Sequence, residues 1–134
     1  MKRFILLVAL LALSSGSAFA EWVAADQRYQ SPGLRTLYLD PTTIQRDGNL
    51  VTIATLMDWK WMQGNRSPTR FYSTKIKKQF DCAEKHVRIL ALTDYYGHMG
   101  TGRSAPGFGG EGDWTSIEPD SLDQALENVA CSSK

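Results

Sequence analysis

Two cysteines, Cys82 and Cys131, constrain the fold of this chain more than any other feature of its sequence. They lie 49 positions apart. In an oxidising compartment an even number of cysteines is normally paired, and a crosslink that closes a loop of about 50 residues stabilises a domain by about 4 kcal/mol in the chain-entropy model. The alternatives are a metal site, for which neither cysteine has further ligands at close spacing, and a catalytic thiol. A structural disulfide is therefore the prediction for an exported chain.

The N-terminal segment predicts export. Lys2 and Arg3 precede ten apolar residues, 4–13, and Ala18-Phe19-Ala20 matches the small-x-small pattern that a signal peptidase cleaves. A membrane-spanning helix needs roughly 20 apolar residues, so this run is too short for an anchor. We expect residues 1–20 to be a signal peptide that is cleaved between Ala20 and Glu21. The sequence offers no later membrane span and no cysteine near residue 20 for a lipid anchor.

The expected mature chain, residues 21–134, suits a single domain with one core. Because Lys2 and Arg3 belong to the signal peptide, 13 of the 15 basic residues remain, against 14 acidic residues. A balanced charge gives the domain no general attraction for nucleic acid. We therefore expect no nucleic-acid partner.

Apolar, β-branched and aromatic residues at every second position predict strands. The clearest strand is 50–61, where Val51, Ile53 and Met57 share one face. Asp40-Pro41 is expected to end the strand before it, because proline cannot donate a hydrogen bond to a ladder. The glycine-rich residues 97–112 are expected to form a loop. The expected strands are residues 22–27, 34–40, 50–61, 70–81, 86–96 and 114–117.

The segment 86–96 alternates in the same way. Leu90 and Leu92 would lie on one face, which predicts a strand covered on both sides and central in the sheet. Five residues would share the other face: Val87, Ile89, Ala91, Thr93 and Tyr95.

Near the C-terminus the spacing of apolar residues changes from that of a strand to that of a helix. Ser121 is a favourable N-cap, and Gln124 three residues later completes a capping box. Cys131 lies off the apolar stripe of this helix, so the helix is expected to end there. Strands followed by one helix predict the α+β class, with an antiparallel sheet of about five to six strands packed against a C-terminal helix. The apolar stripe consists of Leu122, Ala125, Leu126 and Val129.

Signatures of catalysis are weak. The stretch that begins at Gly97 lacks the Gly-Lys-Ser/Thr ending of a phosphate-binding loop, and the sequence has no Gly-x-Ser-x-Gly elbow. His86 and His98 are twelve positions apart and belong to no cluster of metal ligands. We therefore predict a protein that is not an enzyme and that holds no metal and no cofactor.

A basic stretch without acidic residues lies between Lys60 and Phe80. Alternation along 70–81 places Lys75 and Lys77 on the same side of the strand, where they could attract an acidic protein, a sulfated glycan or a lipopolysaccharide phosphate. The alternative, which the sequence favours, is that the lysines protect an exposed edge strand from pairing with other chains. Arg66 belongs to the same stretch. The candidate ligand-binding residues are Arg70, Lys75, Lys77 and Lys78.

Two tryptophans, Trp59 and Trp61, share the apolar face of 50–61 and are expected in the core. The alternative role, stacking against carbohydrate, would require them to be exposed.

Several motifs occur in an order that resembles the surface-adhesin protein E family of small bacterial envelope proteins. The most specific are the Asp40-Pro41 turn, the Asp81-Cys82 strand end and the C-terminal tail from Trp114 to Cys131. The resemblance covers nearly all of the expected mature chain. Its other motifs are Tyr38 to Ile44, Arg46 to Asn49, Tyr72 to Lys75, Tyr95-Tyr96, Gly100, Gly102 and Ile117 to Pro119.

This resemblance implies an antiparallel sheet packed on a C-terminal helix, with the two cysteines bonded. It also implies adhesion, with extracellular-matrix or serum proteins of a host as partners. Because no lipidation cysteine is present, we expect a periplasmic location, with secretion or surface display as alternatives. The alternative function is that of a periplasmic structural or stress-related protein that acts through an envelope partner without host adhesion.

Overall fold

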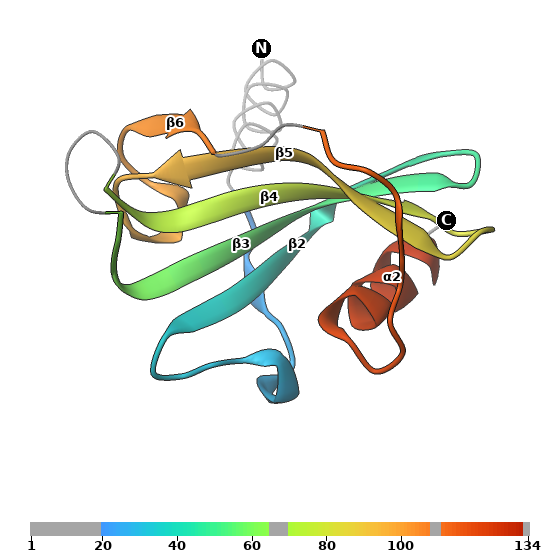
Figure 1. The fold of residues 1–134 in the computed structure, drawn as a ribbon, viewed down its shortest axis with the longest axis horizontal. Coiled ribbons are helices and arrows are strands. Elements are labelled where there is room, and N and C mark those ends of the chain that lie inside the picture. The colour runs from blue at the N-terminus through green and yellow to red at the C-terminus, as the bar shows by residue number, and fades with distance from the viewer. Residues whose placement is uncertain (1–19, 65–69, 108–110, 133–134) are drawn as a thin grey trace, which may run out of the picture.

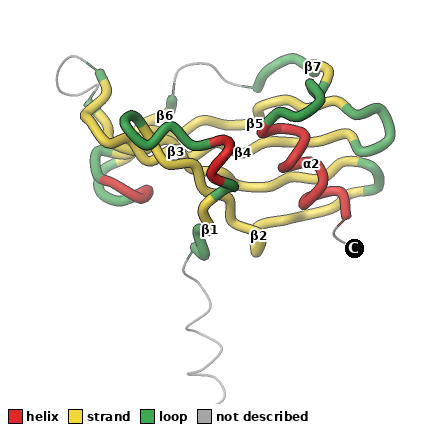
Figure 2. The backbone as a smooth tube through the Cα atoms, turned by 90° about the horizontal axis from the view of Figure 1, so that it is seen from below, coloured by secondary structure: helices red, strands yellow, loops and turns green. Residues whose placement is uncertain are grey.

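The computed structural model describes residues 20–64, 70–107 and 111–132. Within these ranges, one twisted antiparallel sheet forms the body of the molecule, and the α-helix at residues 122–132 packs across one end of one of its faces (Figures 1 and 2). The fold is the α+β arrangement that the sequence predicts. Of the predicted signal peptide only Ala20 is among the described residues, so cleavage after Ala20 stays a prediction.

In the described part of the chain the sheet has seven strands, in the order β1-β2-β3-β4-β5-β6, and β7 pairs with β5. Every pair is antiparallel. The strands are β1 (Val23–Ala24), β2 (Arg35–Asp47), β3 (Leu50–Gln63), β4 (Phe71–Asp81), β5 (His86–Tyr95), β6 (Ser104–Pro106) and β7 (Thr115–Ser116). The helices that the described residues form are the 3₁₀ turns η2 (Gln27–Tyr29) and η3 (His98–Gly100) and the α-helix α2 (Leu122–Ser132).

All six expected strands are confirmed, but residues 97–112 are more than a loop. They contain η3, whose hydrogen bonds hold it against β3 and β4, and the short strand β6, which pairs with β5. Gly100 has a φ of +70°, a backbone conformation that favours glycine. Gly100 therefore allows the chain to turn at the end of η3.

The expectation that Asp40-Pro41 ends its strand is wrong. Strand β2 continues to Asp47 across a β-bulge. At this bulge its pairing with β3 moves from Asp40↔Ala54 directly to Gln45↔Thr52. Within this bulge the Thr43 hydroxyl takes the place of backbone hydrogen bonds between the two strands. It accepts a hydrogen bond from the Ala54 amide at 2.9 Å and donates one to the Asp40 carbonyl at 2.7 Å. Proline is tolerated because a side chain provides the hydrogen bonds.

A second irregularity lies in β5. The pairing with β4 moves from Lys78↔Ile89 to Lys77↔Ala91, so Leu90 is an extra residue. An inserted residue reverses the faces of everything beyond it. Val87 and Ile89 consequently lie on the α2 side, and the expectation that all five alternating residues of this strand share a face is wrong. The prediction that this strand is central in the sheet is confirmed, since β5 lies between β4 and β6.

Helix α2 begins as predicted. The Ser121 hydroxyl accepts a hydrogen bond from the Gln124 amide at 3.1 Å, which identifies Ser121 as the N-cap. The Gln124 side chain donates to Glu127 and Asn128, so the capping box is only half formed. The helix continues past Cys131 to Ser132, one position beyond its expected end.

The buried stripe of α2 differs from the expected one. Leu126 and Ala130 are buried against the sheet, whereas Val129 is 41% exposed. Side chains four residues apart on a helix lie above one another, so the row that begins at Leu122 faces the sheet. The core between α2 and the sheet consists of Leu39, Val51, Ile53, Phe80, Val87, Leu126 and Ala130.

Cys82 and Cys131 form the predicted disulfide. It joins the residue after β4 to the last turn of α2, so it fastens the C-terminal end of the helix to the sheet. The guanidinium of Arg46 donates a hydrogen bond to the Cys131 carbonyl at 2.9 Å and so reinforces this end. None of the helices in the described ranges has the length and apolarity that crossing a bilayer requires.

Candidate functional site

Lys75 and Lys77 lie together on the sheet face opposite α2. The next residue along β4, Lys78, contacts α2, and side chains alternate along a strand, so Lys75 and Lys77 point away from the helix. β4 lies between β3 and β5, paired along most of its length. The alternative that these lysines protect an edge strand is therefore wrong.

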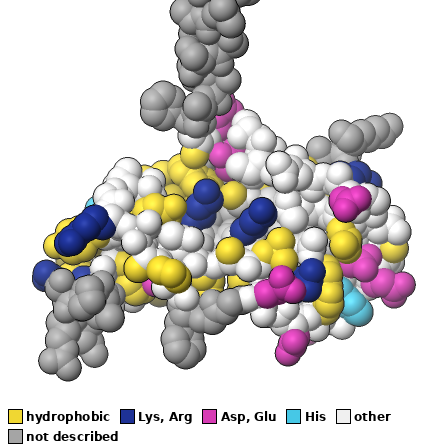
Figure 3. All heavy atoms as spheres, turned by 90° about the horizontal axis from the view of Figure 1, so that it is seen from above, with side chains coloured by type: hydrophobic (Ala, Val, Ile, Leu, Met, Phe, Trp, Pro, Cys, Tyr) yellow, Lys and Arg dark blue, Asp and Glu magenta, His cyan; other side chains and the backbone are white. Residues whose placement is uncertain are grey.

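The cross-strand neighbours of these two lysines are uncharged, and two of them, Ala54 and Leu56, are buried. Lys77 pairs across the sheet with Ala54 and Ala91, and Lys75 pairs with Leu56 and Thr93. We call Lys75, Lys77 and these four neighbours the open basic face. Figure 3 shows the molecule from above, where basic side chains in the middle of the view stand among hydrophobic and uncharged atoms, and acidic side chains lie around the edge.

Neither lysine of the open basic face is neutralised within the described part of the chain. The four ion pairs found there join Lys78 to Asp123, Lys85 to Glu127, Arg88 to Glu111 and His98 to Asp58. Lys77 is exposed and Lys75 is half-buried. Two positive charges two residues apart on a strand, about 7 Å from each other along it, thus remain available to a partner.

Lys78 has a structural role. Its ammonium lies 2.7 Å from a carboxylate oxygen of Asp123 in the first turn of α2, and only 15% of its side chain is exposed. This ion pair fastens the N-terminal end of the helix to β4. The structure therefore separates Lys78 from the other two lysines.

We expect Lys78→Gln to lower the free energy of unfolding by about 1 kcal/mol, which lies between the values for exposed and buried ion pairs. Urea denaturation of the mature domain measures this loss. Asp123→Asn breaks the same ion pair and should give a similar loss. The double variant should lose no more than the larger single loss, and additive losses would contradict a direct interaction.

Arg70 belongs to a different cluster, next to the start of β4. Its guanidinium carbon lies 5.9 Å from the centre of the Tyr96 ring, and the Arg103 guanidinium lies at the same distance from that ring. Sequence reasoning missed Arg103 because it lies in the stretch interpreted as a loop. Arg66 is outside the described residues.

A polar groove, also missed by sequence reasoning, lies beside η3. One Asp58 carboxylate oxygen accepts a hydrogen bond from the Met99 amide at 2.7 Å and lies 3.2 Å from Nδ1 of His98. The two side chains are 40 positions apart, so no local pattern could reveal the pair. The groove has a volume of about 290 Å³ and is lined by Pro32, Arg35, Thr36, Asp58, Trp59, Lys60 and His98.

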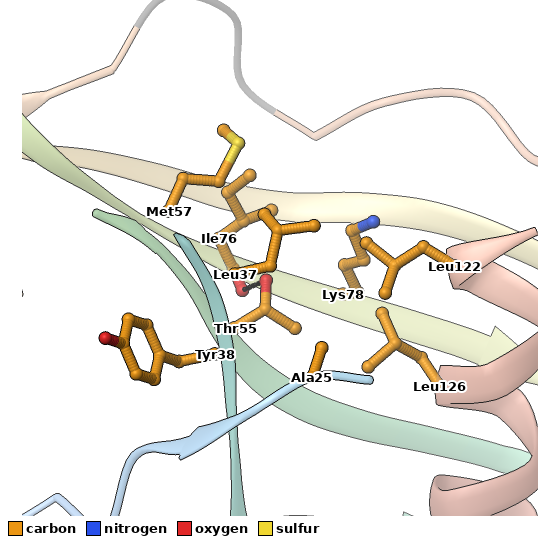
Figure 4. A pocket seen from close by; sticks show the side chains of 9 residues that line it. All are labelled: Ala25, Leu37, Tyr38, Thr55, Met57, Ile76, Lys78, Leu122 and Leu126. Atoms are coloured by element: carbon orange, nitrogen blue, oxygen red, sulfur yellow. Dashed lines mark hydrogen bonds between the residues drawn. The ribbon is translucent and has the colours of Figure 1, made fainter. Parts of the chain in front are cut away.

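An apolar pocket lies where α2 meets the sheet. Leu122 and Leu126 point from the helix toward the strands, and the Thr55 hydroxyl donates to the Ile76 carbonyl at 3.0 Å (Figure 4). Its volume of about 40 Å³ has room for water molecules only, far below the roughly 300 Å³ of typical ligand pockets. This pocket is therefore a packing defect of the core.

Within the described ranges, no three His, Cys, Asp or Glu side chains are grouped as a metal site would require.

The expectation that Trp61 belongs to the core is wrong, because it is 63% exposed. Trp59 is half-buried, and its indole N–H lies 3.4 Å from the Thr74 hydroxyl. Helix α2 covers only the opposite end of this sheet face (Figure 2), and no other helix of the described residues covers the face at the C-terminal end of β3. The exposure that carbohydrate stacking requires is therefore present at Trp61.

Comparison with known proteins places this fold in a family. The family model described as surface-adhesin protein E matches residues 22–132. The comparison with curated proteins finds no significant match.

Solved structures of Haemophilus influenzae protein E have a similar fold. Its selenomethionine form is 18% identical over 72% of this chain and 79% of its own, with a TM-score of 0.63. Crystal form II is 16% identical over 82% and 96% of the two chains, with a TM-score of 0.62. The non-typeable H. influenzae protein is 16% identical over 85% and 86%, also with a TM-score of 0.62. At these identities the likeness establishes the fold, and the match of the family model over residues 22–132 establishes that this chain belongs to the surface-adhesin protein E family.

Proposed function

We propose that this domain is an adhesin-type binding module whose open basic face contacts an anionic partner. The observation that carries the proposal is the pair Lys75 and Lys77, which lies on the sheet face opposite α2 without an ion-pair partner among the described residues. Membership of an adhesin family favours binding over catalysis. The partner is an acidic protein of the matrix or envelope, or an anionic polymer such as a sulfated glycan or lipopolysaccharide.

The shape of the face supports an extended partner. Ala54 and Ala91, the cross-strand neighbours of Lys77, have short side chains, and Lys77 is exposed between them. A long anionic polymer can place several charges along such a surface, and an acidic protein can lie flat against it. Attraction of this kind is screened by salt, with a Debye length of about 8 Å at physiological ionic strength.

We expect the double variant Lys75→Glu with Lys77→Glu to lose at least tenfold in affinity for heparin, lipopolysaccharide or whichever matrix protein the wild-type domain binds. Each substitution replaces attraction by repulsion at the same place. Surface plasmon resonance over a series of salt concentrations measures the loss, and the wild-type affinity should fall as salt rises.

The matched control is Arg28→Glu with Lys60→Glu, which changes the net charge equally at two exposed positions outside the open basic face. It should lose less than threefold. Equal losses in the two double variants would mean that only net charge matters, and the proposed face would be wrong. The structural residue Lys78 provides a second control, because Lys78→Gln should leave the affinity unchanged.

We propose a periplasmic location, supported by the predicted export signal. In this compartment the partner would be an envelope component. Protease treatment of intact cells distinguishes the possibilities: a periplasmic domain stays protected until the outer membrane is permeabilised. Digestion on intact cells would instead place the domain at the surface and favour a host ligand.

A further inference from the structure

Asp40 is a buried carboxylate without a cationic partner among the described residues. It is 1% exposed, and no Lys, Arg or His of the described ranges forms an ion pair with it. Burying a charge without an opposite charge is costly, so a carboxylate in this position calls for a partner.

The contacts of Asp40 divide between its two oxygens. Oδ1 accepts hydrogen bonds from both the backbone amide and the hydroxyl of Thr42, at 3.0 and 2.5 Å. Oδ2 accepts one from the backbone nitrogen of Glu21, at 3.0 Å. The first oxygen therefore organises the bulge in β2, whereas the second is occupied by the backbone N–H of Glu21.

Glu21 is the residue that follows the predicted cleavage site. We propose that Asp40 is the receptor for the amino terminus that signal-peptide cleavage creates, and that the two form a buried ion pair in the mature protein. The inference is independent of the proposed binding function. It rests on two separate observations, the Ala18-Phe19-Ala20 pattern in the sequence and the contact of Asp40 with Glu21 in the structure.

The chemistry of processing provides the missing charge. A signal peptidase hydrolyses the bond between the Ala20 carbonyl carbon and the Glu21 nitrogen. The hydroxyl of the water goes to Ala20, and its hydrogen goes to Glu21. The new amine takes up the proton that the new Ala20 carboxyl group releases, and at neutral pH the α-ammonium is the main form. An N–H group that was neutral thus becomes a cation 3.0 Å from Oδ2.

This ion pair would also secure the edge of the sheet. Glu21 lies two residues before β1, which pairs with β2 only at Val23↔Leu39 and Ala24↔Tyr38. So short a strand has few hydrogen bonds of its own. A charged contact at its start would fix β1 on β2, and the mature domain would be more stable than the unprocessed chain.

The test is a four-chain cycle on the mature domain, which begins at Glu21. The amino terminus is either free or acetylated, and position 40 is either Asp or Asn. With Asp40 present, acetylation should lower the folding equilibrium constant at least tenfold, equivalent to about 1.4 kcal/mol. With Asp40→Asn, acetylation should change it less than twofold. Equal effects of acetylation in the two backgrounds would overturn the proposal.

Two further chains keep the test decisive. Asp47→Asn makes the same chemical change at an exposed position near the end of β2, and it should leave the effect of acetylation undiminished. A wild-type chain that begins at Ala20 moves the ammonium by one residue. If Asp40→Asn does not fold, the Ala20 chain decides: it should be at least tenfold less stable than the chain that begins at Glu21, and equal stability would refute the ion pair.

Discussion

Phe80→Ala is expected to lower the free energy of unfolding by about 4 kcal/mol. Phe80 is fully buried in β4, between its cross-strand neighbours Val51 and Val87, and it belongs to the cluster that receives Leu126 from α2. Truncation to alanine removes most of the ring's buried surface and leaves a cavity where helix and sheet meet. Urea denaturation of the mature domain, followed by tryptophan fluorescence, measures the change.

Trp61→Ala is the matched control, because it truncates a still larger aromatic side chain that is 63% exposed. We expect this variant to lose less than about 1 kcal/mol. Similar losses at the two positions would mean that Trp61 is covered in solution, and the assignment of the core to the α2 side would need revision.

The elements that the sequence predicts best are those whose pattern is long and uninterrupted. In β3, Val51 and Ile53 occupy the core as their alternation indicates. The N-cap of α2 was predictable because the Ser121 hydroxyl accepts a hydrogen bond from the amide of Gln124, only three residues later in the chain. Local patterns of this kind depend on neighbours in the chain, so they hold before the tertiary structure is known.

The predictions that were wrong share a physical cause. Alternation identifies faces only while no residue is inserted, and the bulges after Asp40 and at Leu90 each shift the pattern. In α2, Val129 and Ala130 are adjacent, and only the angle at which the helix lies on the sheet decides which is buried. Trp61 has an apolar pattern, but the helix is too short to cover its end of the sheet.

For the candidate site, the local pattern was predictable from the sequence and the contacts between distant segments were not. Lys78 was grouped with Lys75 and Lys77 as a candidate for ligand binding, although alternation along β4 places only Lys75 and Lys77 on the same side. Alternation could not show that Lys78 meets Asp123, which is 45 positions away. The pairing of Asp58 with His98 likewise depends on η3 folding back over β3. Contacts between distant segments are set by topology, which the sequence pattern specifies only in outline.

Removal of the disulfide by Cys82→Ala with Cys131→Ala is expected to lower the free energy of unfolding by about 4 kcal/mol. The bond closes a loop of 49 positions, and the loss of this constraint increases the entropy of the unfolded chain. Urea denaturation of the double variant against the oxidised wild-type domain measures the effect. Reduced wild-type protein is the control, and it should match the double variant to within about 1 kcal/mol.

The slope of the urea transition shows which state the disulfide acts on. Without the bond, α2 is still held by the ion pair of Lys78 with Asp123 and by the burial of Leu126 and Ala130. If these contacts suffice, the helix stays on the sheet in the native variant. Removal of the crosslink also lets the unfolded chain expand, so the slope should stay the same or rise. A lower slope, together with binding of a hydrophobic dye, would instead mean that the helix has detached and that Ile53 and Phe80 are already exposed before unfolding. An unchanged or higher slope would mean that the disulfide stabilises the domain by restricting the unfolded chain. A lower slope would mean that the disulfide is needed to hold the helix on the sheet in the native state.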